Sequence, residues 1–332
     1  MPDKVIRWGI LGTGKIARTF AQALRELPDA QLVAVASRSG ATASQFGSEF
    51  HIEHCHASYQ ALADDPDVDV IYIATPHTLH AENAAMCLQA GKHVLCEKAF
   101  TMNRREAQEV IDLAREKKLF LMEAMWTRFL PAIAEAKRII ASGEIGTVRH
   151  IQSDLGFVAN VGPQHRVLNP DLGGGALLDI GIYPLSMATC FLGPVDVVQA
   201  TGELGATGID LQTAFSLQHK DGGISSCSCS LIAVTPNQMV IAGELGHILL
   251  HPRFHQVKTL TVTLATGATR TVQCPQIGNG YAHQAIEVMR CVRAGLLESP
   301  VMPLDETLAL MKVLDTIRAQ IKLSYRADGA PI

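Results

Sequence analysis

Short apolar runs alternate with helical patterns along the first part of the chain. Five such runs lie between residues 5 and 124, and they mostly lack polar alternation, as strands do when helices cover both faces of a parallel sheet. Between the first two runs, apolar residues recur every three or four positions and form one helical stripe. This alternation predicts a doubly wound parallel sheet. The five runs read VIRWGIL, QLVAVAS, VDVIYIAT, KHVLCE and LFLMEA.

The pattern changes after Trp126. A helical segment at 131–142 leads through a loop rich in Gly, Pro and Asn to a second helical block at 176–191. Several strand-like runs follow, and over residues 211–217 apolar and polar positions alternate. Such alternation indicates a sheet with one face less fully buried.

Two domains are expected from these patterns, since 332 residues exceed what one typical core uses. Residues 1–125 are predicted to form an α/β domain with a doubly wound parallel sheet. Residues 126–332 are predicted to form an α+β domain with a large, open, mostly antiparallel sheet. Amphipathic helices at 282–293 and 304–323 close this second domain.

Composition and charge narrow the class of protein. The formal net charge is −4 and the pI is near 6.3, so we expect neither a nucleic-acid partner nor an anionic membrane partner. The N-terminal apolar run is too short for a signal peptide, and no stretch is expected to reach the roughly 20 apolar residues of a membrane span. The eight cysteines are scattered and mostly lie in apolar contexts. We therefore expect a cytoplasmic protein with reduced thiols.

Residues 12–17 read GTGKIA and lie between the first strand and the first helix. This is the G-x-G-x-x-A pattern, whose glycines permit a tight turn and the approach of a pyrophosphate to the helix N-terminus. Glycines also end strands for purely structural reasons, but the position in the first strand–helix–strand unit favours a Rossmann NAD(P)-binding domain. The predicted cofactor contacts are Gly12, Thr13, Gly14, Lys15 and Ile16.

The end of the second strand indicates which dinucleotide binds. It reads AVASRSG, without the acidic residue that usually holds the ribose 2′-hydroxyl of NAD. Ser37 and Arg38 stand there instead, and a guanidinium suits a 2′-phosphate. Unless Arg38 is only a solvated loop residue, the sequence predicts NADP in preference to NAD, with use of NAD left open.

The segment TPHTLH follows the strand VDVIYI. Loops at the carboxyl ends of strands form the ligand crevice of an open α/β sheet, so this segment is a further candidate for cofactor binding. The alternative is an ordinary turn before a helix, with Pro76 setting its geometry and incidental histidines. The candidate residues are Thr75, Pro76, His77 and His80.

Two further segments carry side chains suited to proton transfer. In the run HVLCEK at 93–98, a strand ends immediately before Glu97 and Lys98, which are also predicted cofactor contacts. A lysine beside a nicotinamide can polarise a hydroxyl or carbonyl. Asp179 and Tyr183 lie four residues apart in GGGALLDIGIYP, which places them on one face if the segment is helical. A solvated charge pair and a core tyrosine are the plain alternatives.

Together these segments resemble the glucose–fructose oxidoreductase/inositol dehydrogenase/rhizopine catabolism (Gfo/Idh/MocA) family. The resemblance covers essentially the whole chain, through GTGKIA, TPHTLH, CEK, GGGALLDIG and the C-terminal SPVMPL. EAMWTRF and LLDIGIYP look most like the branch of dimeric dihydrodiol dehydrogenases and NADP-dependent D-xylose dehydrogenases, which has Tyr where many members have His.

This resemblance implies roles for particular residues. Tyr183 would be the general acid/base, Lys98 would support it, and Asp179 would orient the substrate or the catalytic pair. Trp126 and Arg128 would lie near the substrate pocket. The family's usual Glu-Lys-Pro is Glu-Lys-Ala here, which puts the lysine geometry in question.

The resemblance further implies a hydride-transferring oxidoreductase acting on a sugar, polyol or trans-dihydrodiol hydroxyl. A homodimer formed through the open face of the C-terminal sheet is also expected. Two alternative functions have the same fold. One is a non-catalytic NADP-binding regulator, and the other is an NAD-assisted hydrolase or lyase. Retention of both Lys98 and Tyr183 favours an enzyme over a regulator.

The patch HIEHCH at 51–56 gathers three histidines and a cysteine. It lies where a surface helix is expected to lead into the next strand. We interpret it as incidental and expect no metal site in the chain.

Overall fold

The computed structural model describes residues 5–329, which divide into two compact units. The first unit comprises residues 5–126 and 277–308, and the second comprises residues 127–276 and 309–329. The sequence places a single boundary near residue 125, whereas the chain also returns to the first unit at residue 277. No change of composition marks that return.

A six-stranded parallel sheet forms the centre of the first unit, in the order β3-β2-β1-β4-β5-β6. The predicted doubly wound sheet is therefore confirmed. The five apolar runs form five of its strands, and the sixth is an edge strand of three residues whose sequence, HCH, gives no apolar signal. The strands are β1 (Ile6–Leu11), β2 (Ala30–Ala36), β3 (His54–His56), β4 (Val70–Ile73), β5 (His93–Glu97) and β6 (Leu121–Ala124).

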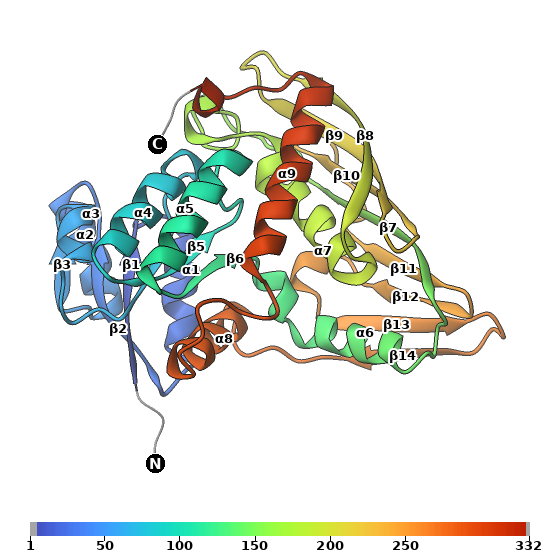
Figure 1. Ribbon diagram of the computed structural model, residues 1–332, viewed down its shortest axis with the longest axis horizontal. Coiled ribbons are helices and arrows are strands. Elements are labelled where there is room, and N and C mark those ends of the chain that lie inside the picture. The colour runs from blue at the N-terminus through green and yellow to red at the C-terminus, as the bar shows by residue number, and fades with distance from the viewer. Residues whose placement is uncertain (1–4, 330–332) are drawn as a thin grey trace. The chain divides into compact units, whose positions relative to one another are not determined.

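Helices cover both faces of this sheet (Figure 1): α1 and α2 pack on one face, and α3, α4 and α5 on the other. The apolar stripe of α1 buries Phe20 and Leu24 completely or nearly so. Asn103 caps the N-terminus of α5, since its Oδ1 accepts a hydrogen bond from the Glu106 backbone amide at 3.0 Å. The helices are α1 (Lys15–Leu24), α2 (Gly40–Phe50), α3 (Tyr59–Ala63), α4 (His80–Gln89) and α5 (Arg104–Lys117).

The returning segment 277–308 is fastened to the first unit by backbone and side-chain contacts. It contains α8 (Ala282–Arg293), which packs against α1. Arg293 forms an ion pair with Asp29 at 2.7 Å, and the Leu121 amide donates to the Leu297 carbonyl at 3.0 Å. The final long helix, α9 (Leu304–Ile321), begins within this segment.

The second unit is built on an eight-stranded sheet in the order β14-β13-β12-β11-β7-β10-β9-β8 (Figure 1). Only the β7–β10 pair is parallel, which confirms the predicted mostly antiparallel sheet. The strands are β7 (Val148–Gly156), β8 (Val195–Leu204), β9 (Asp210–His219), β10 (Ile224–Ser230), β11 (Met239–Gly243), β12 (Gly246–Leu250), β13 (Thr259–Leu264) and β14 (Thr269–Gln273).

One face of this sheet is buried and the other is largely exposed. On β9, Thr213, Phe215 and Leu217 are buried while the residues between them are exposed. Helix α7 (Ile182–Leu192) packs against β7 and β10 on the buried side. It follows a π-helical turn, η4 (Leu177–Gly181), and the unit also holds α6 (Pro131–Ala141).

The helical segment Pro170–Leu192 is long and apolar enough to cross a membrane by length and composition alone. This corrects the expectation that no stretch of the chain reaches that limit. Its apolar window is 89% buried within the protein, however. Such burial is typical of the core helix of a soluble protein, so the segment is weak evidence for a membrane span.

Candidate active site

The glycines of the first loop fit a dinucleotide pyrophosphate. Gly12 has φ +107°, and an added Cβ would lie 2.9 Å from the Ala74 carbonyl oxygen, so only glycine suits this turn. Gly14 is exposed, and a Cβ there would meet nothing within 4 Å. It is also the N-cap of α1, where no side chain caps the helix amides. The helix N-terminus therefore presents its amides and its dipole to open space.

Ser37 and Arg38 follow the buried end of β2. The Ser37 hydroxyl lies 2.6 Å from Thr42 Oγ1, which keeps this loop close to the start of α2. The Arg38 side chain is exposed and, within residues 5–329, has no hydrogen-bond or ion-pair partner. A guanidinium in this state has all its donors available for a phosphate.

The strand order places three predicted segments at one edge of the sheet. Strands β1 and β4 are neighbours although the chain passes through β2 and β3 between them, so the topological switch point lies between β1 and β4. Because all the strands are parallel, Gly12, Thr75 and Lys98 follow the carboxyl ends of β1, β4 and β5 on the same edge. Open α/β sheets bind their ligands at this place.

His80 is completely buried and connects two of these loops. Its Nε2 lies 2.9 Å from the Thr75 carbonyl oxygen and its Nδ1 lies 2.9 Å from that of Ala99. Burial lowers the pKa of His80, and the nearby Lys98 ammonium adds to this effect, although the carbonyl contacts oppose it. His80 is therefore a neutral side chain that links the loop at Thr75 to the loop at Ala99, and it has no exposed surface for a ligand.

Other contacts tie the same two loops together. His77 Nε2 lies 3.2 Å from the Lys98 carbonyl oxygen, and the side-chain Nδ2 of Asn83 donates to Thr75 Oγ1 at 3.1 Å. Pro76, between Thr75 and His77, is only partly exposed. The TPHTLH segment thus fixes the position of the backbone that carries Lys98.

Glu97 and Lys98 have different surroundings. Glu97 is buried; one carboxylate oxygen accepts a hydrogen bond from the Tyr72 hydroxyl and the other accepts one from the Lys98 amide at 3.2 Å. Lys98 is half-buried, and its peptide bond to Ala99 is cis. Glu97 thereby anchors the end of β5 from inside the sheet.

In the second unit, the glycine loop positions the helix that bears the predicted acid/base. Gly175 has φ +127°, and a Cβ there would overlap the Asp210 carboxylate. Asp210 Oδ2 accepts from the Leu177 amide at 2.8 Å and from Thr213 Oγ1 at 2.7 Å. The Tyr325 hydroxyl donates to the Gly174 carbonyl. This buried network holds the start of the π turn.

Asp179 and Tyr183 lie on that turn and on α7, and both are buried in the second unit. Asp179 forms an ion pair with Arg166 at 3.0 Å. Tyr183 is 6% exposed, and its ring centroid lies 5.3 Å from that of His255. The segment is a π turn continued by an α-helix, where the sequence suggested one uninterrupted helix. Such π turns are frequent at functional sites.

Trp126 is held by ring stacking and Arg128 by hydrogen bonds, each within its own unit. In the first unit, Trp126 stacks on Tyr281 with ring centroids 4.1 Å apart. In the second unit, the buried Arg128 guanidinium donates to the Ser186 hydroxyl at 2.8 Å and to Thr189 Oγ1 at 3.0 Å. Arg128 therefore anchors α7, the helix that carries Tyr183.

Sequence reasoning missed three residues beside the predicted ones. They are Arg166, His255 and Tyr281, which lie in segments without a recognisable motif. His255 and Tyr281 are also far along the chain from the residues they contact. A buried carboxylate such as Asp179 needs a cationic partner. That requirement is the signal from which a partner such as Arg166 could have been expected.

Comparison with known proteins assigns the family. A model described as "Oxidoreductase family, NAD-binding Rossmann fold" matches residues 6–125, and one described as "GFO/IDH/MocA C-terminal domain" matches residues 133–249. The chain belongs to the GFO/IDH/MocA oxidoreductase family. The resemblance seen in the sequence motifs is therefore confirmed, and residues 6–125 form the NAD-binding Rossmann domain of that family.

Three of the similar proteins have names of oxidoreductases. Trans-1,2-dihydrobenzene-1,2-diol dehydrogenase from Danio rerio is 36% identical over 98% of this chain and 99% of its own. D-xylose 1-dehydrogenase (NADP(+)) from Hypocrea jecorina is 35% identical over 96% of this chain and 93% of its own. A 3-ketoreductase from Actinomadura kijaniata, solved with NADP and TDP-benzene, is 26% identical with a TM-score of 0.87 and covers 96% of this chain and 98% of its own.

Proposed function

We propose that the chain is an NADP-dependent dehydrogenase that oxidises a hydroxyl group of a sugar, polyol or trans-dihydrodiol. The arrangement at the carboxyl edge of the parallel sheet carries this proposal. The open glycine loop follows β1, and Lys98 follows β5 on the other side of the switch point. The dehydrogenases among the similar proteins support the same reaction type.

The cofactor would be held by the first loop and the end of β2. Amides at the N-terminus of α1 would bind the pyrophosphate, and Gly12 and Gly14 leave room for it. Ser37 and the uncommitted Arg38 guanidinium would bind the 2′-phosphate. Loop 75–77 would line the cofactor crevice, with His80 and Glu97 positioning its backbone from the interior. The NADP named for two of the similar proteins supports this preference.

Three side chains would carry the proton transfer. Tyr183 would accept the hydroxyl proton of the substrate, and the Lys98 ammonium would stabilise the phenolate or polarise the substrate oxygen. Asp179, held by Arg166, would orient the substrate or the pair. Bound NADP⁺ supplies the hydride acceptor, while the protein supplies position and charge.

A substrate panel with purified protein tests the reaction. Aldoses, polyols and aromatic dihydrodiols are mixed with NADP⁺, and reduced cofactor is followed by its absorbance. Steady formation of NADPH with one of these classes supports the proposal. Dinucleotide binding without turnover would point to a regulator, and substrate conversion without net reduction of added cofactor would point to a hydrolase or lyase.

Variants test the residue roles. We expect Tyr183→Phe and Lys98→Met each to lower turnover by about 100-fold or more while dinucleotide affinity, measured by calorimetry, is preserved. Lys117→Met, at an exposed position of α5, is the matched control and should leave turnover unchanged. Wild-type turnover in either active-site variant would remove the proposed mechanism.

We also propose a cytoplasmic location. All eight cysteines lie within the described residues and are free. Six of them are buried, where thiols behave as small apolar side chains. Free, scattered thiols are typical of proteins kept in a reducing compartment.

A further inference from the structure

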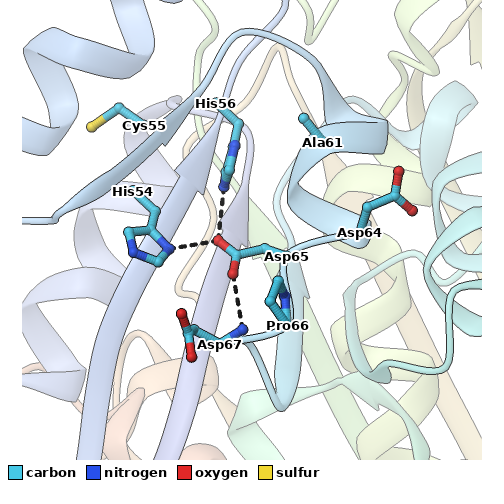
Figure 2. Close-up of a pocket in the computed structure, with 8 residues that line it drawn as sticks. All are labelled: His54, Cys55, His56, Ala61, Asp64, Asp65, Pro66 and Asp67. Atoms are coloured by element: carbon cyan, nitrogen blue, oxygen red, sulfur yellow. Dashed lines mark hydrogen bonds and ion pairs between the residues drawn. The ribbon is translucent and has the colours of Figure 1, made fainter.

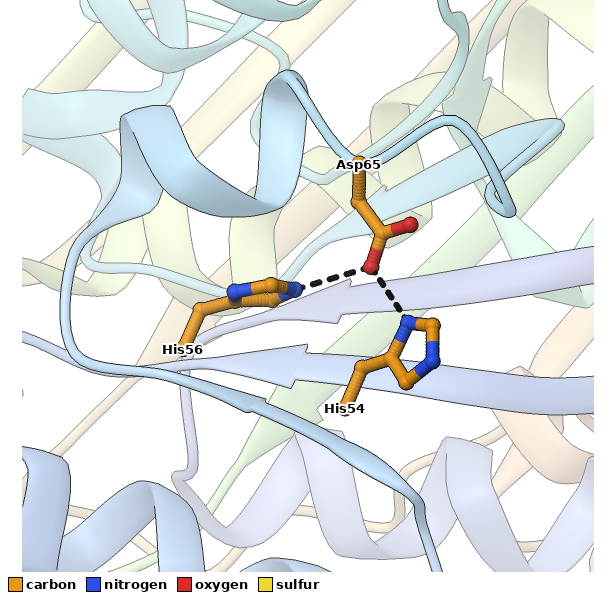
Figure 3. Close-up of side chains that lie close together, drawn as sticks. All are labelled: His54, His56 and Asp65. Atoms are coloured by element: carbon orange, nitrogen blue, oxygen red, sulfur yellow. Dashed lines mark hydrogen bonds and ion pairs between the residues drawn. The ribbon is translucent and has the colours of Figure 1, made fainter.

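Two histidines and an aspartate meet at β3, the edge strand of the parallel sheet (Figures 2 and 3). His54 Nδ1 lies 2.7 Å from Asp65 Oδ2, and His56 Nε2 lies 2.9 Å from the same oxygen. The three donor atoms all lie within 4.8 Å of one another. The proposed reaction uses none of these residues.

The alternation of β3 explains how the two histidines come together. Residues 54 and 56 of a strand point to the same face, and residue 55 points to the other. Cys55 accordingly contacts the α2 side, where its thiol donates to the Ile52 carbonyl at 3.7 Å, and Figure 2 shows it directed away from the histidines. The cysteine of the HIEHCH patch is thus excluded from the cluster.

Asp65 is the third member and comes from the turn after α3. Its side chain is only 3% exposed, and its other oxygen, Oδ1, accepts the Asp67 amide at 2.9 Å. This bond fixes the orientation of the carboxylate, as outer contacts do for metal-binding carboxylates. The histidine side chains are 35% and 24% exposed, so the cluster opens to solvent on their side.

We propose that His54, His56 and Asp65 bind a divalent first-row transition metal ion such as Zn²⁺. Two imidazoles and one carboxylate are a donor set suited to zinc, and three protein ligands leave a fourth position for water. Donor atoms around tetrahedral zinc lie about 3.3 Å apart, so the present distances need only a small side-chain rotation. The expectation that the histidine patch is incidental rested on local sequence, which does not contain Asp65.

The charges around the cluster favour a cation. Asp67 and Asp64 line the same depression as the three ligands (Figure 2). Two cationic side chains on neighbouring residues have other partners: Lys92 Nζ donates to the Asp65 and Val68 carbonyl oxygens, and Arg7 pairs with Asp67 and Asp69. Neither occupies the carboxylate oxygen that the histidines share.

Zinc titration of the full chain after removal of metal by a chelator tests the site. We expect one Zn²⁺ to bind per chain, and we expect His54→Ala and His56→Ala each to weaken that binding by about 100-fold or more. Controls come from the same patch: Cys55→Ser and His51→Asn should bind as the wild type does. Absence of one-to-one binding, or equal affinity in the His→Ala variants, would overturn the proposal.

A spectroscopic readout identifies the ligands and does not depend on enzymatic activity. Cobalt(II) is added in place of zinc, and its visible absorption is compared between the wild type and His56→Ala. Visible bands of four- or five-coordinate cobalt that His56→Ala abolishes support the assigned ligands. A thiolate charge-transfer band, or bands that persist in His56→Ala, would show that the ion is bound elsewhere.

Discussion

At the scale of single residues, Arg38 and His80 show how surroundings decide what an ionisable side chain does. Arg38 is exposed and, in the described part of the chain, uncommitted, so its charge is available to a ligand. His80 is buried with both ring nitrogens against carbonyl oxygens, so its role is internal. A neutral imidazole carries one N–H and can donate to only one of those two oxygens.

Arg38→Ala should erode the preference for NADP⁺ over NAD⁺. A charge-assisted contact with a phosphate contributes about 1.5–3 kcal/mol, so we expect NADP⁺ affinity to fall by about 10- to 100-fold while NAD⁺ affinity stays constant. Calorimetric titration with both dinucleotides measures this. Arg105→Ala, at a partly exposed position of α5, is the control. An unchanged NADP⁺/NAD⁺ ratio in Arg38→Ala would contradict the role of Arg38.

His80 should make the stability of the protein depend on pH. Its folded-state pKa is lower than the usual value near 6.5, so below that pH the unfolded chain binds a proton that the folded chain excludes. The free energy of unfolding should therefore fall as the pH drops below about 6.5, by at most about 1.4 kcal/mol per pH unit for this one proton.

Urea unfolding of the wild type and of His80→Gln at pH 7.5 and 5.5 measures this contribution. His80→Gln should be less stable at pH 7.5 and should lose less stability on acidification. His150→Gln serves as the control, because the His150 side chain is exposed. The same pH dependence in the wild type and His80→Gln would refute the assignment.

At the scale of elements, the helix that carries Tyr183 is held by hydrogen bonds to the π turn before it and to its own backbone and side chains. Burial raises the pKa of the Asp210 carboxyl, although its hydrogen bonds with Thr213 and the Leu177 amide oppose that shift. Arg128 holds the same helix one turn further on, through Ser186. The position of Tyr183 thus depends on contacts on both sides of it, at Leu177 and at Ser186.

Gly175→Ala should destabilise the second unit by about 2 kcal/mol or more. The left-handed backbone at this position disfavours any Cβ, and the added methyl would overlap the Asp210 carboxylate. Gly162→Ala is the matched control, because a Cβ there meets nothing within 4 Å. A shift of the urea midpoint in Gly162→Ala as large as in Gly175→Ala would show that the loop network is not the cause.

At the scale of the whole molecule, the outer face of the eight-stranded sheet exposes apolar side chains in register. Val197 on β8 and Ile224 on β10 both pair with Gln218 on β9, so the three lie side by side. Val197 is 44% exposed and Ile224 is 53% exposed. These two exposed apolar side chains, one on each side of Gln218, are consistent with the homodimer that the family resemblance implies through this face.

Light scattering at micromolar concentration should therefore report a dimer. Ile224→Lys should shift the mass towards the monomer, because a charge buried without a partner opposes association. Ile286→Lys, which replaces an exposed apolar residue of α8 in the first unit, should leave the mass unchanged. A monomeric wild type would contradict the proposed dimer.

The sequence by itself determined features that depend on neighbouring residues. Strand, loop and helix follow one another at residues 6–24, so the cofactor loop could be predicted from GTGKIA alone. The five apolar strands and the alternation on β9 could also be predicted from the sequence. The spacing of apolar residues within an element indicates which of its faces is buried. The family motifs added the candidates Lys98 and Tyr183.

Only the tertiary structure decided which distant residues meet. It placed His255 beside Tyr183 and returned residues 277–308 to the first unit. Over a shorter separation, it brought Asp65 from the turn after α3 to His54 and His56 on β3. These contacts depend on how strands are ordered and how loops cross between them. A local sequence pattern describes neighbouring residues only, so it does not predict contacts between residues of different elements.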